Sequence, residues 1–534
     1  MSSMKGGQAV VAALLRESVE TVFGIPGVHT LEIYDALYDR PQIRHILARH
    51  EGGAAFMADG YARASGRVGV VLAITGPGVT NASTALGQAY ADGVPLLLVH
   101  SDVDSRYRGL GNLHELKDQR GMLAAITKWG GRAERVGDIP VLIHIALERA
   151  QEGWPGPVHV EIPLDILGTQ EEVALPEQEA RLRPQVAEEE LAQAAALLAQ
   201  SERPLIYAGW GVTAAAANAE LLELAERLGA VVLTDPVGKG TLPEDHPLCL
   251  GAAFMDREAV EPLLVRADVG LAIGTRLGAM ETRNGELALP KPLIHIDPLA
   301  ENIGRLYPTE VGIVGEIKAA LGALLQRLPR RSRPGPREEV ARAKAQAYQR
   351  LHERAPQIAR ILGDLRSALG REGILGLDMT LPAYWAARYL EVYEPRTLLN
   401  PYYFMALGYG LPAAIGAKLA RPDRPVVALC GDGGFLFTCQ ELATAALYGL
   451  DLTIVLFNND RYGAIYRHQQ RRYEGRTVAT ELANPDFVAF AESFGIRGVR
   501  LCSYEDLGVA LRETLSRREL ALIEVSAHTL PAPW

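Results

Sequence analysis

Cysteine is scarce in this chain of 534 residues, and so is lysine. The four cysteines, Cys249, Cys430, Cys439 and Cys502, are scattered and lack the close spacing of a metal site. They predict reduced, mostly buried thiols of an intracellular protein and exclude a disulfide framework. Only eight of the 54 basic residues are lysine, but an arginine bias alone does not establish thermophily.

Long hydrophobic runs and single-sign charge clusters are also lacking. No uninterrupted apolar stretch approaches the ~20 residues that a membrane helix needs. The short apolar stretch 9–15 runs directly into Arg16 and Glu17, which favours a first helix over a signal peptide. Acidic and basic residues are interspersed at a net charge of −10, so no basic face for nucleic acid is evident. We expect a soluble, cytoplasmic protein that binds neither membrane nor nucleic acid.

Apolar runs alternate with helical stretches along the whole chain, which predicts an α/β fold with parallel sheets. Two proline-containing stretches, 170–184 and 329–339, interrupt this alternation and are typical of linkers. The chain is long enough for several cores. We therefore predict three doubly wound domains, and their ranges are 1–168, 185–328 and 345–534.

The most informative motif lies in the third domain. One apolar run ends in a glycine-rich turn with a single aspartate, and the next apolar run ends in paired asparagine. The two turns are Gly431-Asp432-Gly433-Gly434 and Asn458-Asn459. Parallel sheets bind ligands at the carboxyl ends of their strands, and carboxylate and amide oxygens suit Mg²⁺. The glycines let backbone N–H groups approach phosphates. Gly-Asp-Gly alone would also fit an ordinary turn, but the paired asparagine at this distance disfavours that interpretation.

This pattern resembles the thiamine diphosphate motif, in which Gly-Asp-Gly is followed after twenty-odd residues by Asn. The resemblance implies three metal ligands, namely the side chains of Asp432 and Asn459 and the backbone carbonyl of Arg461. It also implies a set of residues around the cofactor diphosphate. This set comprises Gly431, Gly433, Gly434, Tyr462 and Gly463.

The first domain supplies an independent second half. Its segment His50-Glu51-Gly52-Gly53, the apolar run 68–74 and the turn Thr75-Gly76-Pro77-Gly78 resemble the pyrimidine-binding domain of the same family. The resemblance makes Glu51 the cofactor-activating acid. Thiamine loses its C2 proton to its own 4′-imino group, and a carboxylic acid at N1′ favours the imino tautomer. We expect Glu51 in an apolar pocket that keeps its proton available, although a solvated glutamate at a helix start is the commoner fate. Further expected cofactor contacts are Pro26, Gly27, Pro77 and Asn81.

A third segment, from Met405 to Gly410, completes the resemblance. Family members carry a bulky aliphatic residue before Gly-Phe/Tyr-Gly, where it forces the two cofactor rings into a V, and Leu407 matches that position. The backbone carbonyl two residues earlier accepts a hydrogen bond from the 4′-amino group. That carbonyl usually belongs to Gly and here belongs to Met405.

The whole chain resembles the thiamine diphosphate-dependent 2-oxo acid decarboxylases and acetolactate synthases. The resemblance implies pyrimidine-binding, central and diphosphate-binding domains and a small 2-oxo acid as substrate. It also implies sites shared between subunits, in a homodimer or a dimer of dimers. Acetolactate synthases bind FAD in the central domain, but Gly209-Trp210-Gly211 and Gly274-Thr275-Arg276 match only in part. A flavin has no role in decarboxylation, so we do not favour FAD. A dinucleotide-dependent dehydrogenase is not favoured either, because the middle domain lacks the complete Gly-x-Gly-x-x-Gly pattern of a dinucleotide site.

The reaction depends on less specific residues. Leu113 and His114 stand where acetolactate synthases carry Phe-Gln, and Ala464 and His468 stand where they carry Met and Trp. These departures favour simple decarboxylation to an aldehyde. Residues 23–30 together with 113–116 are similar to the 5-guanidino-2-oxopentanoate decarboxylase type. Acetolactate synthesis from pyruvate stays the alternative, and a non-catalytic regulatory homologue is the alternative outside enzymology.

Three histidines are candidates for proton transfer, because protonation after CO₂ loss needs a group that titrates near neutrality. They are His29, His114 and His468, and each has a structural role as its alternative. Glu115 could bind a cationic substrate tail or pair with Lys117 or Arg120 at the surface, and the surface pair is the expected outcome.

Overall fold

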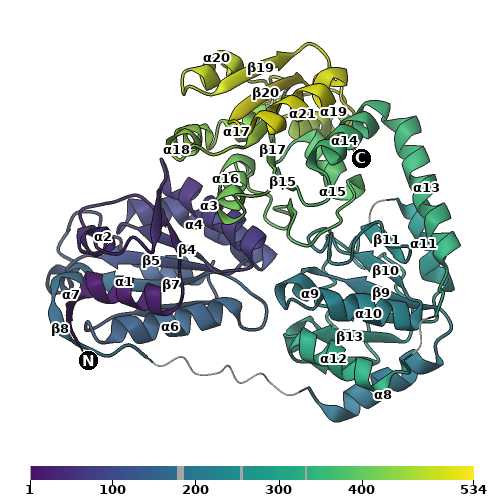
Figure 1. Ribbon diagram of the computed structural model, residues 1–534, viewed down its shortest axis with the longest axis horizontal. Coiled ribbons are helices and arrows are strands. Elements are labelled where there is room, and N and C mark those ends of the chain that lie inside the picture. The colour runs from purple at the N-terminus through teal and green to yellow at the C-terminus, as the bar shows by residue number, and fades with distance from the viewer. Residues whose placement is uncertain (1, 177–185, 253–255, 331–332) are drawn as a thin grey trace.

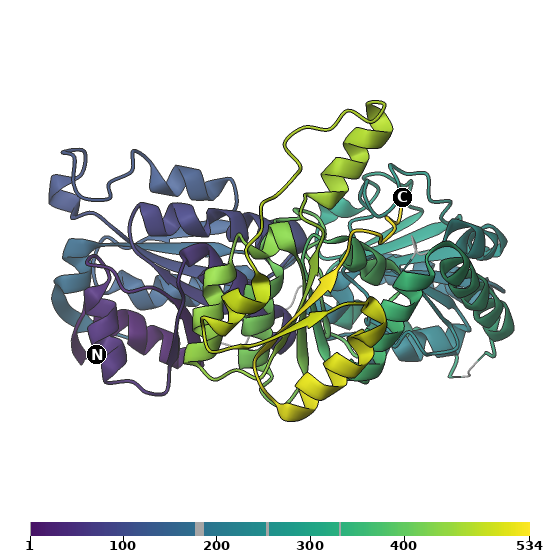
Figure 2. The same cartoon turned by 90° about the horizontal axis from the view of Figure 1, so that it is seen from above.

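The structure is a computed structural model that describes residues 2–176, 186–252, 256–330 and 333–534. It contains three six-stranded parallel sheets, one in each of three α/β domains, which confirms the predicted fold class. The N-terminal domain is purple to blue in Figure 1, the middle domain teal, and the C-terminal domain green to yellow. Figure 2 shows the C-terminal domain lying across the junction of the other two.

The N-terminal sheet has the strand order β3-β2-β4-β5-β7-β6. Its strands are β2 (Thr21–Gly24), β3 (Arg44–Leu47), β4 (Gly69–Ala73), β5 (Leu96–Asp102), β6 (Trp129–Arg132) and β7 (Val158–Pro163). Its helices are α1 (Gly6–Arg16), α2 (Leu31–Tyr38), α3 (Glu51–Ser65), α4 (Pro77–Asp92), α5 (Gln119–Ala124), α6 (Asp138–Gln151) and α7 (Leu164–Gly168).

Part of the first predicted linker is a strand. β1 (Ser2–Lys5) pairs antiparallel with β8 (Gln170–Val173), and Val173 is buried in the core of the N-terminal domain. The mostly polar sequence of β8 concealed it, because only one of its four residues is apolar. Residues 177–185 of that linker and 331–332 of the second lie outside the described residues. The domain boundaries stay predictions.

The middle sheet has the order β11-β10-β9-β12-β13-β14. Its strands are β9 (Pro204–Ala208), β10 (Val231–Thr234), β11 (Cys249–Ala252), β12 (Val269–Ile273), β13 (Leu293–Asp297) and β14 (Val311–Val314). Its helices are α8 (Glu188–Gln200), α9 (Trp210–Ala214), α10 (Asn218–Leu228), α11 (Arg257–Arg266) and α12 (Ile317–Arg327).

The C-terminal sheet has the order β16-β15-β17-β18-β20-β19. Its strands are β15 (Ile374–Leu377), β16 (Leu398–Leu399), β17 (Val426–Gly431), β18 (Thr453–Asn458), β19 (Arg497–Leu501) and β20 (Ala521–Ser526). Its helices are α13 (Arg337–Arg354), α14 (Pro356–Leu369), α15 (Leu381–Tyr389), α16 (Gly410–Ala420), α17 (Asp432–Phe435), α18 (Leu442–Leu447), α19 (Gly463–Arg472), α20 (Phe487–Glu492) and α21 (Leu507–Arg517).

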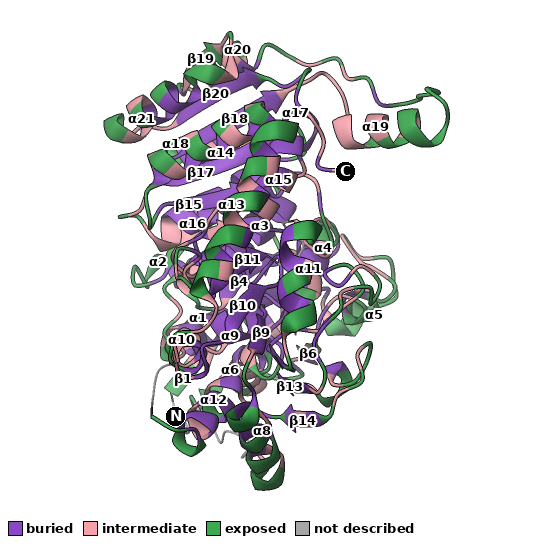
Figure 3. Cartoon of the chain, turned by 90° about the vertical axis from the view of Figure 1, so that its right-hand side faces the viewer, coloured by how far each residue is buried: buried purple, intermediate pink, exposed green. Residues whose placement is uncertain are grey.

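Continuous apolar runs form the inner strands, because a parallel strand covered by helices is buried on both faces. Every residue of β4, β5 and β17 is buried. Figure 3 shows these strands in purple beneath helices with exposed green faces. In the same view α19, which buries none of its residues, stands away from the rest of the C-terminal domain. No helix in the described ranges is both long and apolar enough to cross a membrane.

Helices α3 and α16 join the N-terminal and C-terminal domains at very close range. A Cβ on Gly60 would lie 2.0 Å from the carbonyl oxygen of Ala413, and one on Gly416 would lie 1.9 Å from that of Met57. Glycine is therefore required at both positions. The apolar core runs continuously across this contact and includes Phe56, Met57, Tyr409 and Leu411.

We predict that Gly416→Ala destabilises the protein by about 1–3 kcal/mol, because the added methyl group must push α3 and α16 apart. The matched control is Gly363→Ala in α14, where a Cβ meets nothing within 4 Å. That change should stabilise the helix by about 0.5–1 kcal/mol. Thermal unfolding of both variants measures the contrast. Equal melting temperatures for the two variants would contradict the close helix contact.

Candidate active site

Adjacent strands β17 and β18 bring the predicted metal ligands together. Asp432 is the first residue after β17, and Asn459 follows β18. The buried Asp432 carboxylate accepts hydrogen bonds from the backbone N–H of Arg461 at 3.3 Å and from Nδ2 of Asn484 at 2.8 Å. The backbone N–H of Asn459 also donates to it. The three predicted ligands therefore lie around one carboxylate.

The two neighbouring asparagines are used differently. Asn458 Nδ2 donates to Glu524 at 2.9 Å, and Asn458 Oδ1 accepts from the backbone N–H of Asp460 at 3.1 Å. The side chain of Asn459 makes no hydrogen bond to any residue that the structure describes. Asn458 thus holds the turn together, and Asn459 has its amide oxygen available for a ligand.

The donor set around Asp432 fits a divalent cation. Burial raises the pKa of Asp432, and the hydrogen bonds from Asn484 and the surrounding backbone oppose that rise. Oδ1 of Asn484 is buried without a partner. A cation here would offset the cost of burying the Asp432 carboxylate, because buried charges are favourable only when they are paired or bind a metal. No cluster of three His, Cys, Asp or Glu side chains with metal geometry occurs among the described residues, so the site would rely on one carboxylate, an amide and a carbonyl.

The glycines after Asp432 permit close packing. A Cβ on Gly433 would lie 2.7 Å from the ring of Tyr462, and one on Gly434 would lie 2.8 Å from Asp378 Oδ1. The backbone N–H of Tyr462 donates to Thr480 O at 2.9 Å, which fixes the turn before α19. Larger residues in place of either glycine would push Tyr462 or Asp378 away from the strand ends.

Asp378, to which no sequence motif pointed, holds the segment that carries Leu407. Its carboxylate accepts from the backbone N–H groups of Gly408 at 3.2 Å and Gly410 at 3.3 Å. Burial raises the pKa of Asp378 to about 6, and these backbone hydrogen bonds oppose the rise. Met405 has a left-handed backbone with φ of 56° and is partly exposed. The apolar run that becomes β15 ends at Asp378, so its position after a strand was a usable signal.

In the N-terminal domain, Glu51 begins α3 and is buried, so it is not a solvated glutamate. Its Oε2 accepts from Nδ2 of Asn81 at 2.9 Å. His50 caps the helix by accepting the backbone N–H of Gly52 at 3.0 Å. Pro77 is the first residue of α4, so the predicted residues of the second motif converge on the starts of two neighbouring helices.

The turn after β2 carries Pro26 and Gly27, and it packs on the same region. A Cβ on Gly27 would lie 2.4 Å from Cδ1 of Ile74, and the carbonyl of Gly27 accepts the N–H of Thr30 at 2.8 Å. His29, two residues after Gly27, is buried, and its Nδ1 lies 3.0 Å from Thr75 Oγ1. Burial and the nearby His114 lower the pKa of His29, and Asp102 opposes them.

The other two candidate histidines lie in different places. The ring of His114 lies 5.6 Å from that of His29 in an edge-to-face arrangement. His468, on α19, stacks on Trp534 near the chain end, with 5.0 Å between ring centroids. The structure therefore brings His29 and His114 together and places His468 against the C-terminal tail.

Glu115 has a structural role in its own loop. Its carboxylate accepts the backbone N–H groups of Gly109, Gly111 and Asn112. The structure gives it these partners in place of the expected surface pair with Lys117 or Arg120. No sequence motif pointed to this role, because loop closure depends on backbone geometry.

The carboxyl edge of the middle sheet is lined by carboxylates. Asp235, Glu281 and Asp297 are buried, and each has one oxygen bonded to backbone N–H groups and one oxygen without a partner. Arg276, from the partial flavin motif, lies over the rings of Tyr403 at 4.2 Å and Trp154 at 5.1 Å. Aromatic rings and unpaired carboxylates do not suit an anionic flavin diphosphate.

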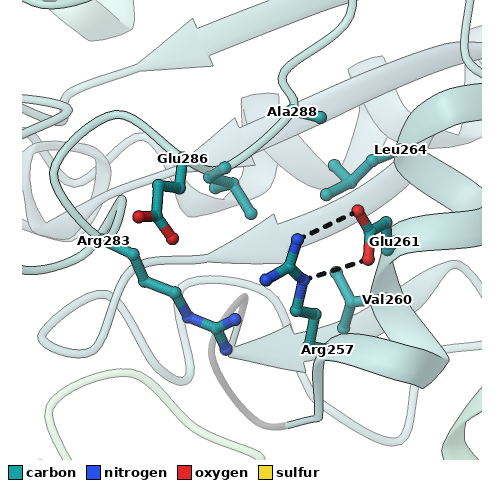
Figure 4. Close-up of a pocket in the computed structure, with 8 residues that line it drawn as sticks. Arg257, Val260, Glu261, Leu264, Arg283, Glu286 and Ala288 are labelled. Atoms are coloured by element: carbon teal, nitrogen blue, oxygen red, sulfur yellow. Dashed lines mark hydrogen bonds and ion pairs between the residues drawn. The ribbon is translucent and has the colours of Figure 1, made fainter.

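A separate shallow hollow lies between α11 and the loop that follows Leu277 (Figure 4). Arg257 and Glu261 pair across one side of it at 3.0 Å, and Arg283 and Glu286 come from the loop. None of the predicted site residues lines this hollow, so it is not part of the candidate active site.

Family models match all three domains. They are described as the N-terminal thiamine pyrophosphate binding domain of thiamine pyrophosphate enzymes for residues 4–122, the central domain for 191–324 and the C-terminal thiamine pyrophosphate binding domain for 378–525. The chain belongs to the thiamine pyrophosphate enzyme family. Thiamine pyrophosphate and thiamine diphosphate are the same cofactor, so the protein is a thiamine diphosphate-dependent enzyme.

Individual relatives cover nearly the whole chain. A protein of Pseudomonas aeruginosa named probable 2-ketoarginine decarboxylase is 40% identical over 98% of this chain and 94% of its own length. A probable acetolactate synthase large subunit of Methanocaldococcus jannaschii is 35% identical over 99% and 93%. The acetolactate synthase large subunit of Lactococcus lactis is 34% identical over 98% and 94%. These relatives share the family and are named for two different reactions, 2-ketoarginine decarboxylation and acetolactate synthesis.

We predict that Asp432→Ala lowers thiamine diphosphate affinity in the presence of Mg²⁺ by at least about tenfold, because a charged ligand facing the cation and diphosphate is lost. Isothermal titration calorimetry measures the affinity. The control is Asp423→Ala, an exposed residue three positions before β17 at the opposite edge of the sheet. Unchanged diphosphate affinity in Asp432→Ala would rule out this metal site.

We predict that Asp235→Asn flattens the pH dependence of stability. Burial, then the charge of Glu281, raise the pKa of Asp235 to about 7. The folded state therefore holds a proton that the unfolded chain loses above pH ~4, so wild-type stability falls between pH ~4 and about 7. Asparagine removes this loss. Thermal unfolding at pH 5 and pH 8 measures this: the melting temperature of the variant, relative to the wild type, should be higher at pH 8 than at pH 5. The same difference in melting temperature at both pH values would contradict the raised pKa of the buried carboxyl.

Proposed function

We propose that this enzyme decarboxylates a 2-oxo acid without oxidation and releases an aldehyde, with thiamine diphosphate and Mg²⁺ as cofactors. The observation that carries the proposal is the pair of imidazoles, His29 and His114, beside the Gly76-Pro77 turn. Imidazole is the side chain best suited to protonate a carbon near neutral pH. A proton at that carbon gives an aldehyde, whereas an acetohydroxy acid requires a second 2-oxo acid in the same space.

Residues from both halves would hold the cofactor. Thiamine diphosphate, when bound, supplies the electron sink for loss of CO₂. Glu51 would hold the pyrimidine N1′, the Met405 carbonyl would accept the 4′-amino group, and Leu407 would support the V-shaped conformation. Asp432, Asn459 and the Arg461 carbonyl would bind Mg²⁺, and the backbone near Gly431, Gly433, Gly434 and Gly463 with Tyr462 would surround the diphosphate.

For the substrate we propose the class of 2-oxo acids with a guanidino tail. The 40% identical relative named for 2-ketoarginine decarboxylation supports this choice. Glu115 already accepts backbone N–H groups of its own loop, so a guanidino tail would share that carboxylate with the loop or meet another acidic group.

Acetolactate synthesis is the second candidate, and the relatives at 34–35% identity support it. Against it stands His468, which occupies the position of the family Trp and stacks on Trp534. A non-catalytic homologue is disfavoured by the presence of Glu51, Asp432 and Asn459 together. We also propose that the middle domain binds no FAD, because its carboxylate-lined edge opposes a diphosphate.

We propose a homodimer or a dimer of dimers in which two subunits complete each site. Ala406 N–H donates to Gln88 Oε1 at 3.0 Å, which fixes the Met405–Leu407 segment near the end of α4. Pro77 begins α4, eleven residues earlier or about 16 Å along the helix axis. Asn81, which holds Glu51, lies seven residues or about 10 Å before Gln88, so Glu51 and the Met405 segment of one chain contact different parts of α4. Exposed apolar side chains in both domains, among them Leu113, Phe404 and Phe437, support a partner surface.

A panel of 2-oxo acids tests the function, with pyruvate, branched, aromatic and guanidino members each assayed for aldehyde and acyloin. We predict that aldehyde is the main product and that the guanidino acid has the highest kcat/KM. Rapid acetolactate formation from pyruvate with little aldehyde from any acid would establish the synthase instead.

Glu51→Gln should bind the cofactor but lose at least about 100-fold in kcat, because it lacks the acid that serves cofactor activation.

A further inference from the structure

A chain of buried hydrogen bonds leads from His29 into the N-terminal domain. His29 Nδ1 lies 3.0 Å from Thr75 Oγ1, and the Thr75 hydroxyl donates to Ser101 Oγ at 2.9 Å. The backbone N–H of Thr75 donates to the same Ser101 oxygen at 3.0 Å. His29 is 7% exposed, and Thr75 and Ser101 are 0% exposed, so water cannot replace these partners.

The direction of these hydrogen bonds favours one tautomer of His29. Ser101 Oγ accepts both the N–H and the O–H of Thr75, which leaves Thr75 Oγ1 as an acceptor toward the imidazole. A neutral imidazole that donates through Nδ1 has a bare, basic Nε2. Nε2 of His29 has no hydrogen-bond partner among the residues that the structure describes.

A buried glutamine, Gln119, binds the backbone of Ser101. Gln119 Nε2 donates to the Ser101 carbonyl at 3.0 Å, and Gln119 Oε1 accepts the backbone N–H of Gly76 at 2.8 Å. Gln119 is 1% exposed. One side chain therefore ties the turn that precedes Pro77 to the strand that carries Ser101, so the hydroxyl chain cannot rotate away from His29.

His114 is held beside His29 by an unusual backbone conformation. Its φ of 64° is left-handed, and a Cβ on Gly76 would lie 2.2 Å from its carbonyl oxygen. Non-glycine residues persist in this conformation where the surrounding structure imposes it, often at functional sites. The loop that Glu115 closes supplies this constraint, and the two imidazole rings meet edge to face.

Charged side chains of neighbouring elements lie near the histidine pair. The Asp102 carboxylate faces His29, but Arg132 binds it at 2.6 Å and Arg108 at 3.2 Å. His100 lies on the far side of Ser101, where its Nδ1 is 3.2 Å from the Ser101 carbonyl. A charge on His114 lowers the pKa of His29, because like charges this close repel each other.

We propose that Ser101 and Thr75 are positioning residues that hold His29 as its Nδ1–H tautomer, so that His29 Nε2 and His114 together carry the single proton delivered to the substrate carbon. The role in catalysis rests on the proposed decarboxylation. When CO₂ leaves, the proton on one imidazole forms the new C–H bond and that imidazole becomes neutral. One proton taken up from water restores the pair for each CO₂ released.

Thr75→Val tests the proposal, since it keeps the shape of threonine and removes the hydroxyl. The readout is ¹⁵N NMR of histidine-labelled protein without cofactor, with the His29 signals identified by their loss in His29→Asn. Wild type and Thr75→Ser should show a protonated Nδ1 and a bare Nε2 at pH 8. Thr75→Val should shift the proton toward Nε2. The control is Thr127→Val, which removes another buried hydroxyl of this domain, bonded to Leu123 O at 2.8 Å.

Kinetics separate positioning from simple structural loss. With the best 2-oxo acid, Thr75→Val should lose about tenfold or more in kcat, retain KM within about twofold and shift the pH profile, because proton transfer rather than binding is impaired. Thr75→Ser should restore the wild-type values. An Nε2–H tautomer in the wild type, or a Thr75→Val enzyme indistinguishable from Thr127→Val, would overturn the proposal. If the tautomer is as expected but no acid yields aldehyde, the proposed function fails and the positioning by Thr75 and Ser101 stands.

Discussion

A buried ion network holds residues 403–409 of the C-terminal domain, the segment that carries Met405 and Leu407, against the N-terminal domain. Arg63, on α3, binds Asp59 at 2.6 Å and Asp92, at the end of α4, at 2.7 Å. Tyr409 donates to Asp59 at 2.6 Å, and Tyr403 donates its backbone N–H to Asp92 at 2.9 Å. Removing one member would leave a buried charge without compensation, which is far costlier than losing a surface pair. The network therefore specifies one register between the domains, and the glycine contact between α3 and α16 depends on that register.

Much of the fold was readable because parallel sheets repeat a simple pattern of apolar run, turn and helix. Asp432 and Glu51 were also readable, since each sits in a dense local motif. Asn484 was not, because it lies 52 residues after Asp432 in an irregular segment and reaches the carboxylate only through tertiary packing. Ser101 was hidden in the same way, because it lies in the polar end of β5, and the sheet order sets which strand lies beside it.

The two halves of the candidate site differ in how their chemistry is prepared. At the C-terminal edge, a buried carboxylate and an orphaned amide oxygen create a need that a cation with bound phosphates satisfies. At the N-terminal edge, Nδ1 of His29, Thr75 and Ser101 already have partners, whereas Nε2 of His29 has none among the described residues. The first half therefore offers ligand atoms, and the second presents an imidazole nitrogen held by buried hydrogen bonds. Such preorganisation costs no rearrangement at the moment of reaction.

Within one chain the C-terminal domain reaches the start of α3 through Glu441, which accepts the backbone N–H of Arg49. Among the described residues, no hydrogen bond or ion pair joins Glu51, His29 or His114 to Asp432 or Asn459. The ion network holds the Leu407 segment near the end of α4 that lies away from Pro77. A flexible interdomain contact could close the gap by hinge motion, but a continuous core with two glycine backbone contacts resists it. This rigidity supports the proposed completion of the site by a second copy.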